Sequence, residues 1–385
     1  MSSYPPSGPP PTTTLRQRLA DLRGPAVPPR PLDARALAAL AANPGCGRRA
    51  LLDGAGVDKT ALAAALGSPA AFGQSQFAII RGNSFEARVK GDGGAELLRL
   101  VHEHLGAGSE PPGPGAQVPD LTAAGPEGRA ARTALALREA TAAAAATGTW
   151  TLLDHPMLAL EVAGSPAYLE PDAVVVHPDG RWTVVEIKSF PMIDGAADAA
   201  KVGAAARQAA VYVLALEKTA GKLASAVVGH TALLVCPKDF SNLPAAAPVD
   251  IRRERAVTRR QLERLTRVEE LAAALPEGLS FDPERTAEEL GEAVAAVSAA
   301  YAPECLAACE LAFHCRERAR AAGEVTALGR SVRGELGALT TVGEALAAAA
   351  GSGSGSGGPD DPTAASLHHA ARLRAEALEA AACPC

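Results

Sequence analysis

The stretch that most constrains the fold is "EPDAVVVHPDGRWTVVEIKSF" at residues 170–190. Two apolar runs flank a Pro-Asp-Gly turn sequence at 178–180, which predicts a β-hairpin. A three-residue turn with Gly180 in the left-handed conformation is a common hairpin solution, and it pairs His177 with Arg181. The hairpin therefore has a definite register, which decides which side chains face each other.

That register places charged side chains at the open end of the hairpin. Asp172 falls opposite Glu186, and Glu186 and Lys188 point to the same face because they are two residues apart. Two facing carboxylates repel each other, and burying them unpaired costs more still. A divalent cation removes both costs, and oxygen ligands suit Mg²⁺ or Mn²⁺. The alternative is a solvated sheet edge on which Lys188 forms an ion pair with a carboxylate.

The rest of the chain predicts helices around a small sheet, an α/β fold. Aromatic residues are only 3% of the 385 residues although hydrophobic residues are 48%, so alanine supplies much of the apolar content and favours helix. Helical patterns cover residues 31–66, 78–106, 126–148 and 195–218 and resume from residue 255, whereas three strands are expected within 156–190 and another at 230–237.

The two ends of the chain have a different composition. Residues 1–30 are rich in Pro, Ser and Thr, which predicts disorder. The segment 351–362 reads as a flexible Gly/Ser linker, and 363–385 as a helical tail. An apolar run of about 18 residues is lacking, and the N-terminus does not read as a secretory signal. We therefore expect a cytoplasmic protein without a membrane span.

Three motifs resemble those of one nuclease superfamily. Asp172 followed by Glu186-Ile187-Lys188 resembles the D…(D/E)-x-K signature of the PD-(D/E)XK nucleases, and Pro171 supplies the "PD". Gln208 and Tyr212 lie four residues apart on one helical face, similar to the Q-x-x-x-Y motif of the RecB-like branch. Upstream, Glu86 in "RGNSFEARV" resembles the first motif of the family.

The resemblance implies a fold and a reaction. It implies a restriction-endonuclease-like core at about 78–250 within a RecB-like domain at 31–340. It implies that Glu86, Asp172, Glu186 and the Ile187 carbonyl hold Mg²⁺ or Mn²⁺. Lys188 would position the attacking water, and Gln208 and Tyr212 would line the DNA path. The expected activity is hydrolysis of DNA phosphodiester bonds, most of all as an exonuclease.

Cysteines form a second group. Cys305 and Cys309 share a helical face, Cys315 follows, and Cys46 is the natural fourth member. One early and three late cysteines resemble the iron–sulfur branch of RecB-family nucleases, which act in CRISPR adaptation or beside helicases in repair. The resemblance implies a [4Fe–4S] cluster joining helices at 40–52 and 300–320.

Other interpretations of the cysteines stay open. The spacing C-x3-C-x5-C departs from the usual C-x2-C of the first pair. Four thiolates also suit Zn²⁺, and small buried apolar side chains are the plainest alternative. Cys236, in an apolar strand, fits that last description best. Cys383 and Cys385 follow the tail and have no expected role.

DNA is the expected partner, although the net charge of −6 means that any contact must come from a local basic patch. Arg48 and Arg49 are candidates, and a longer basic helix is another. Its arginines are Arg252, Arg253, Arg255, Arg259, Arg260, Arg264 and Arg267. A solvated helix with glutamate partners is the alternative. A non-enzymatic, DNA-binding scaffold of the same fold competes with the nuclease.

Overall fold

The computed structural model describes residues 11–69, 76–106, 108–113, 115–162, 165–223, 225–239, 241–263, 268–352 and 361–382. The chain divides into two compact units. The first unit comprises Met1–Pro44, Ala50–Val57 and Phe72–Ala274, and the second comprises Gly45–Arg49, Asp58–Ala71 and Leu275–Cys385. The sequence predicted one nuclease domain over 31–340. Within that range the two units divide at 274/275, and two short early segments, Gly45–Arg49 and Asp58–Ala71, belong to the second unit.

The fold is mixed α/β, as expected. The strands are β1 Thr151–Asp154, β2 Leu158–Val162, β3 Ser165–Leu169, β4 Ala173–Val176, β5 Arg181–Ile187, β6 Val227–Val228, β7 Thr231–Pro237 and β8 Pro244–Asp250. The α-helices are α1 Pro11–Arg23, α2 Ala34–Ala42, α3 Gly47–Gly54, α4 Lys59–Ala65, α5 Gln76–Val89, α6 Gly91–Leu105, α7 Gly125–Thr147, α8 Ala199–Ala220, α9 Arg252–Glu263, α10 Val268–Ala273, α11 Ala287–Ala295, α12 Ala312–Ala321, α13 Arg330–Glu335, α14 Val342–Ala349 and α15 Pro362–Ala382. Short 3₁₀ helices lie at η1 Pro303–Ala307 and η2 Val325–Leu328.

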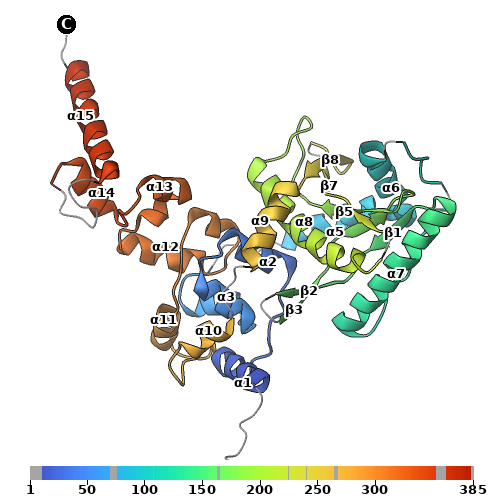
Figure 1. Cartoon of the computed structure of the whole chain (residues 1–385), viewed down its shortest axis with the longest axis horizontal. Helices are drawn as coiled ribbons and strands as arrows, with labels where there is room; N and C mark the ends of the chain where they lie inside the picture. Colours follow the sequence, from blue (N-terminus) through green and yellow to red (C-terminus); the bar gives the residue numbers. More distant parts are fainter. Residues whose placement is uncertain are drawn as a thin grey trace, which may run out of the picture. The chain divides into compact units, whose positions relative to one another are not determined.

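The first unit is built on a small mixed sheet of order β1-β4-β5-β7-β8, with β6 beside β5 (Figure 1). The pairs β1–β4, β4–β5 and β7–β8 are antiparallel, whereas β5 pairs in parallel with β6 and β7. The parallel connection from β5 to β7 passes through α8, as a crossover helix requires. The hairpin strands β2 and β3 form a separate two-stranded sheet.

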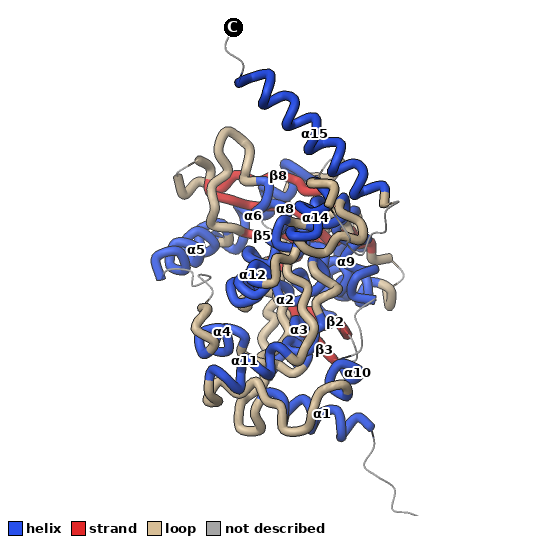
Figure 2. Tube along the Cα trace, turned by 90° about the vertical axis from the view of Figure 1, so that its left-hand side faces the viewer, coloured by secondary structure: helices blue, strands red, loops and turns tan. Residues whose placement is uncertain are grey.

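Helices cover both faces of this sheet (Figures 1 and 2). On one face, residues of α5 and α6 pack with Val185 and Ile187 of β5. On the other face, α2, α7 and α8 pack with Trp182 and Val184. Alternate residues of β5 therefore enter different halves of the core, as the period of a strand demands. Many buried residues of α8 are alanines. Their small side chains allow the helix to pack close to the strands.

Some sequence expectations for the first unit were wrong. Strand β1 was not predicted, and 156–190 holds four strands rather than three. Strand β8 was missed because its prolines, at 244 and 248, argue against a strand except at a sheet edge, which is where β8 lies. Disorder was expected over 1–30, but α1 forms there and Leu22 is buried. Residues 1–10 lie outside the described residues.

The second unit is helical in the part of the chain that the structure describes. Its C-terminal end is a small apolar core in which Leu367 of α15 packs with Leu336, Leu339 and Ala348. The predicted tail is therefore a helix that packs on α14. Most of the predicted linker, residues 353–360, lies outside the described residues, as do Cys383 and Cys385. Among the described helices, none has the length and apolar character needed to cross a membrane.

Candidate active site

The hairpin forms in the predicted register. Gly180 has φ of 80°, in the left-handed region, and the His177 amide donates to the Arg181 carbonyl at 2.8 Å. The pairing of β4 with β5 includes the first residue of β4, Ala173, which lies opposite Val185, so the preceding position, Asp172, lies opposite Glu186. The local turn chemistry therefore fixes the approach of two carboxylates that are fourteen positions apart in the chain.

Glu186 is the most deeply buried charge of this group. Its side chain is 2% exposed, and it lies on β5, between β4 and β7, so the alternative of a solvated sheet edge was wrong. The Lys188 ammonium forms an ion pair with Glu186 Oε1, as that alternative did foresee. Within the described residues, however, neither carboxylate oxygen receives an aligned hydrogen bond. Burial raises the Glu186 pKa to about 7, with Lys188 opposing and Asp172 adding to the rise.

Asp172 is held by the backbone of the facing strand. The Ile187 amide donates to Asp172 Oδ2 at 2.6 Å, so Ile187 contacts the site through its N–H. Burial raises the pKa of Asp172, and the charge of Lys188 works against this rise. Burial lowers the pKa of Lys188, but the carboxylates of Glu186 and Asp172 outweigh that effect and raise it. Lys188 is thus a protonated ammonium between two acids.

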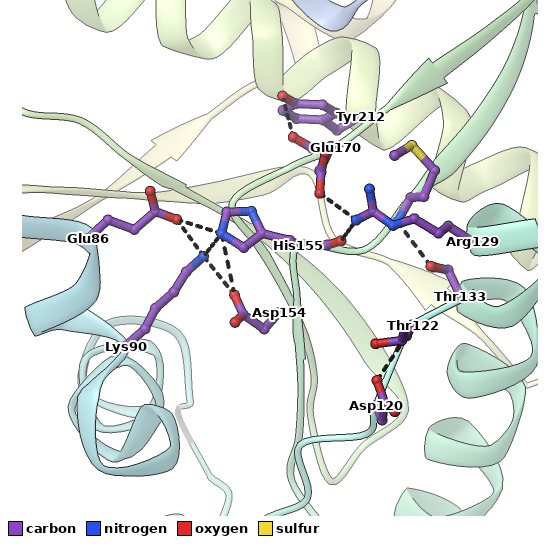
Figure 3. Close-up of polar contacts among 11 residues, drawn as sticks. Glu86, Lys90, Asp120, Thr122, Arg129, Thr133, Asp154, His155, Glu170 and Tyr212 are labelled. Carbon is purple, nitrogen blue, oxygen red and sulfur yellow. Dashed lines mark hydrogen bonds and ion pairs between the residues drawn. The ribbon is translucent and has the colours of Figure 1, made fainter. Parts of the chain in front are cut away.

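Glu86 enters from α5 within a second set of charges (Figure 3). Lys90 Nζ lies 2.5 Å from Glu86 Oε1 and 2.7 Å from Asp154 Oδ1. His155 Nε2 lies 3.0 Å from Glu86 Oε1. The hydrogen bond from His155, together with the hydrogen bond and charge of Lys90, overcomes burial and lowers the Glu86 pKa to about 2. Glu86 is therefore ionised and ion-paired.

His155 joins this set of charges to the hairpin. Its backbone has φ of 45°, unusual for a residue other than glycine, and its amide donates to the Asp172 carbonyl at 3.3 Å. The hydrogen bond to Glu86 raises the pKa of its imidazole. The charge of Glu86 in turn raises the pKa of both Asp172 and Glu186. Glu86, Asp172, Glu186 and Lys188, here called the carboxylate centre, thus occupy one neighbourhood.

Gln208 and Tyr212 share a face of α8, as predicted, but their contacts are structural. Gln208 Nε2 donates to Tyr212 Oη at 2.9 Å. Tyr212 Oη donates to the Glu170 carbonyl at 3.2 Å (Figure 3). Tyr212 is buried, and burial raises its pKa, with Glu186 adding to the rise. Glu170 also accepts from Arg129 at 2.5 Å. The pair therefore anchors the chain two residues before Asp172.

The donors present suit a hard cation, although the described residues hold no group of three His, Cys, Asp or Glu arranged to bind one. Glu186 offers two buried oxygens that no aligned donor satisfies. Asp172 faces it across the strands, and Glu86 is within electrostatic range of both. Oxygen donors with excess negative charge fit Mg²⁺ or Mn²⁺. Glu86 would have to exchange Lys90 for the cation.

The four predicted cysteines all belong to the second unit. Cys46, Cys305, Cys309 and Cys315, here called the cysteine centre, are not joined in disulfide bonds within the described residues and are partly exposed. Burial raises the Cys315 pKa to about 11, and the charges of Cys309 and Cys46 add to it. Burial also raises the pKa of Cys309. Cys46 and Cys309 are therefore within electrostatic range of Cys315, although the described cysteines do not form a group of three arranged to bind a metal. Cys236 is a buried residue of β7, as expected.

Five of the candidate DNA-binding arginines have partners within the protein: Arg48, Arg49, Arg252, Arg255 and Arg259. Arg48 and Arg49 are buried rather than presented on the surface. On α9, Arg255 and Arg259 both bind Glu217, and Arg252 binds Asp250. The alternative of an acid-paired helix thus holds for these three positions. Arg264 and Arg267 lie outside the described residues.

Sequence reasoning missed several residues around the carboxylate centre. Lys90 could have been found, since it follows Glu86 by four positions on a helix. Asp154 and His155 depend on β1, and their approach to the hairpin is fixed only by the β1–β4 pairing. Arg129 reaches this neighbourhood from α7, where it donates to the His155 carbonyl. No local signal marks it.

Comparisons with protein-family models, with curated proteins and with solved structures gave no match for this chain.

Proposed function

We propose that this chain is a metal-dependent DNA nuclease of the PD-(D/E)XK superfamily, in its RecB-like branch, with a restriction-endonuclease-like core in the first unit. The supporting observation is the buried Glu186, whose oxygens lack aligned donors opposite Asp172 and beside Lys188. Such an excess of buried acid is costly unless a cation completes it. The reaction is hydrolysis of DNA phosphodiester bonds, with exonuclease action expected.

Each residue of the carboxylate centre has a separate role in the proposed hydrolysis. Asp172 and Glu186 would hold Mg²⁺ or Mn²⁺, with Glu86 completing the set and the Ile187 carbonyl as a further donor. The bound ion supplies a Lewis acid for the phosphate and lowers the pKa of a water molecule. Lys188 offers its ammonium to the attacking water and to charge that develops on the phosphate. Gln208 and Tyr212 keep the segment before Asp172 in place.

The cysteine centre belongs to the same proposal. Cys46, Cys305, Cys309 and Cys315 would hold a [4Fe–4S] cluster, with Zn²⁺ as the alternative. Both suit four thiolates, and the proposal is supported by the electrostatic proximity of Cys46 and Cys309 to Cys315 in the second unit. The expected setting is cytoplasmic DNA repair, CRISPR adaptation or phage defence, with a helicase or adaptation proteins as separate partners.

The test is a cleavage assay on labelled single-stranded and duplex DNA with Mn²⁺, with and without chelator. Asp172→Ala and Lys188→Ala are expected to abolish cleavage while circular dichroism stays native. Asp179→Ala is the matched control, because it removes an exposed carboxylate from the turn of the same hairpin. Full activity in Asp172→Ala contradicts the assignment. A native wild-type protein that binds DNA but never cuts it supports the scaffold instead.

A further inference from the structure

One arginine of the second unit is buried and has no carboxylate partner within the part of the chain that the structure describes. Arg48, in the first turn of α3, is 6% exposed. Its Nη1 donates to Cys315 Sγ at 3.2 Å and its Nη2 to the Val297 carbonyl at 3.1 Å. Its Nε is buried and has no hydrogen-bond partner among the described residues. The backbone holds the arginine in place, since the Arg48 amide donates to the Ser298 carbonyl at 2.7 Å.

The neighbouring Arg49 has a carboxylate partner and serves as a comparison for Arg48. Arg49 is 5% exposed, and its Nη1 lies 3.0 Å from Glu310 Oε2 and 3.1 Å from the Ala308 carbonyl. Arg49 thus has an anion, whereas Arg48 has a carbonyl and a sulfur. A buried guanidinium keeps its charge, because arginine does not release its proton in proteins.

The position of Arg48 beside the thiols indicates which anionic group could compensate the guanidinium charge. Cys46 precedes it by two residues, and Cys315 accepts its hydrogen bond. A neutral thiol is a weak acceptor and leaves the guanidinium charge uncompensated. Four thiolates around Zn²⁺ or a [4Fe–4S] core carry a net charge of about −2. An anionic metal–thiolate group would therefore supply the charge that the described residues around Arg48 do not.

We propose that Arg48 is a positioning residue of the cysteine centre, which compensates the negative charge of a four-thiolate metal group through its hydrogen bond to Cys315. This inference rests on the part of the proposed function that assigns a metal group to the cysteines. It is independent of the carboxylate centre and of DNA cleavage. Arg48 then favours retention of the metal and, in an iron–sulfur cluster, favours the more negative, reduced state.

The test compares Arg48→Met with wild type after anaerobic purification of the full chain, with iron, zinc and sulfide analysis. Loss of the compensating charge is expected to speed metal release to a chelator by about tenfold, within the range for outer-shell partners of metal ligands. If the group is iron–sulfur, its midpoint potential is expected to become more negative. A tenfold change in the reduced-to-oxidised ratio corresponds to about 59 mV for a one-electron couple. Arg318→Met, on the exposed side of α12, is the matched control and leaves both readouts unchanged.

Stability separates charge compensation from plain packing. With metal removed, Arg48→Met is expected to unfold at the same or a higher temperature than wild type, because it deletes an uncompensated buried charge. With metal bound, it unfolds at a lower temperature. Arg48→Lys, which keeps the charge, restores part of the metal retention. A variant that is destabilised equally in both forms, or unchanged in both, overturns the inference.

The two proposals fail in distinguishable ways. A wild-type protein that carries neither iron nor zinc after reconstitution overturns the role of Arg48, while metal-dependent cleavage that is lost in Asp172→Ala still supports the nuclease. A protein with a chelator-sensitive thiolate centre but no cleavage supports Arg48 and contradicts the nuclease.

Discussion

The carboxylate centre and the cysteine centre have opposite charge imbalances. In the first unit, the carboxylates of Glu186 and Asp172 share the ammonium of Lys188, so these three groups carry an excess of negative charge. In the second unit, Arg48 is a buried cation facing a thiol, so the site lacks negative charge. A buried charged group that the surrounding protein does not compensate indicates the charge of the ligand that would compensate it. One centre suits a bare cation, and the other a metal group that is anionic as a whole.

The largest expected effect comes from neutralising the acid of the first centre. Glu186→Gln keeps the shape of the side chain and removes its charge, so cleavage is expected to fall by about a thousandfold or more. The same change is expected to stabilise the metal-free protein by about 1–3 kcal/mol. Because the folded-state pKa is raised to about 7, the cost of the ionised acid appears as pH rises from about 4.5 through 7. The gain is therefore largest above pH 7.

Thermal unfolding in chelator and in Mn²⁺ checks this prediction. Mn²⁺ should raise the unfolding temperature of wild type and leave Glu186→Gln unchanged. A variant that is less stable than wild type in chelator at pH 8 would show that Glu186 is already satisfied, and the contrast between the two centres would be lost.

A smaller effect sharpens the contrast by removing a source of pH sensitivity that belongs to neither centre, the imidazole of His177. His177 is buried against Trp150, and burial, with Arg181 adding, lowers its pKa to about 4. The stability from its neutral form is complete above the ordinary value of 6.5 and is lost as pH falls toward 4. Wild type should lose roughly 2–3 kcal/mol over that window. His177→Gln should show a flatter acid limb in urea unfolding between pH 7 and 4, and an unchanged slope contradicts the burial argument.

Much of the first unit is local in origin and could therefore be predicted. The hairpin follows from a turn at Gly180, and the Glu86 helix and α8 follow from their own periodicity. The approach of Asp154 and His155 could not be predicted, because it depends on the pairing of β1 with β4 rather than on either strand alone. The assignment of Cys46 to a unit made mostly of residues after 274 is likewise a tertiary outcome.

Burial also decides the roles of residues in ways that the sequence does not show. Gln208 and Tyr212 carry the predicted spacing, but the sequence did not indicate that the Tyr212 hydroxyl donates to a backbone carbonyl. Arg48 reads as a surface residue by type and becomes informative only through its burial. In both cases the residue type was correct and its environment decided its role.

Lys90 tests whether the carboxylate centre can replace an internal cation by an external one. Lys90→Met leaves Glu86 and Asp154 without their ammonium, and both are partly exposed, so screening limits the loss in chelator to about 1–2 kcal/mol. Mn²⁺ should recover part of that loss, because a divalent ion supplies the missing charge. Arg99→Met, which breaks exposed ion pairs on α6, is the control and should not respond to Mn²⁺. Equal recovery in both variants contradicts the idea.

The smallest effect comes from a hydrogen bond between neutral groups. Tyr212→Phe removes the donor to the Glu170 carbonyl, two residues before Asp172, and is expected to cost about 1 kcal/mol of stability at every pH. If that bond positions Asp172, Mn²⁺ affinity measured by calorimetry falls along with the cleavage rate, by about fivefold to tenfold. Gln208→Ala, which loses only the bond to Tyr212, should have the weaker effect on both. Metal analysis of the cysteine centre should be unchanged, because a neutral bond in the first unit does not alter the charge around Arg48. A lower cleavage rate with unchanged Mn²⁺ affinity would instead assign Tyr212 to contact with DNA, which its burial argues against.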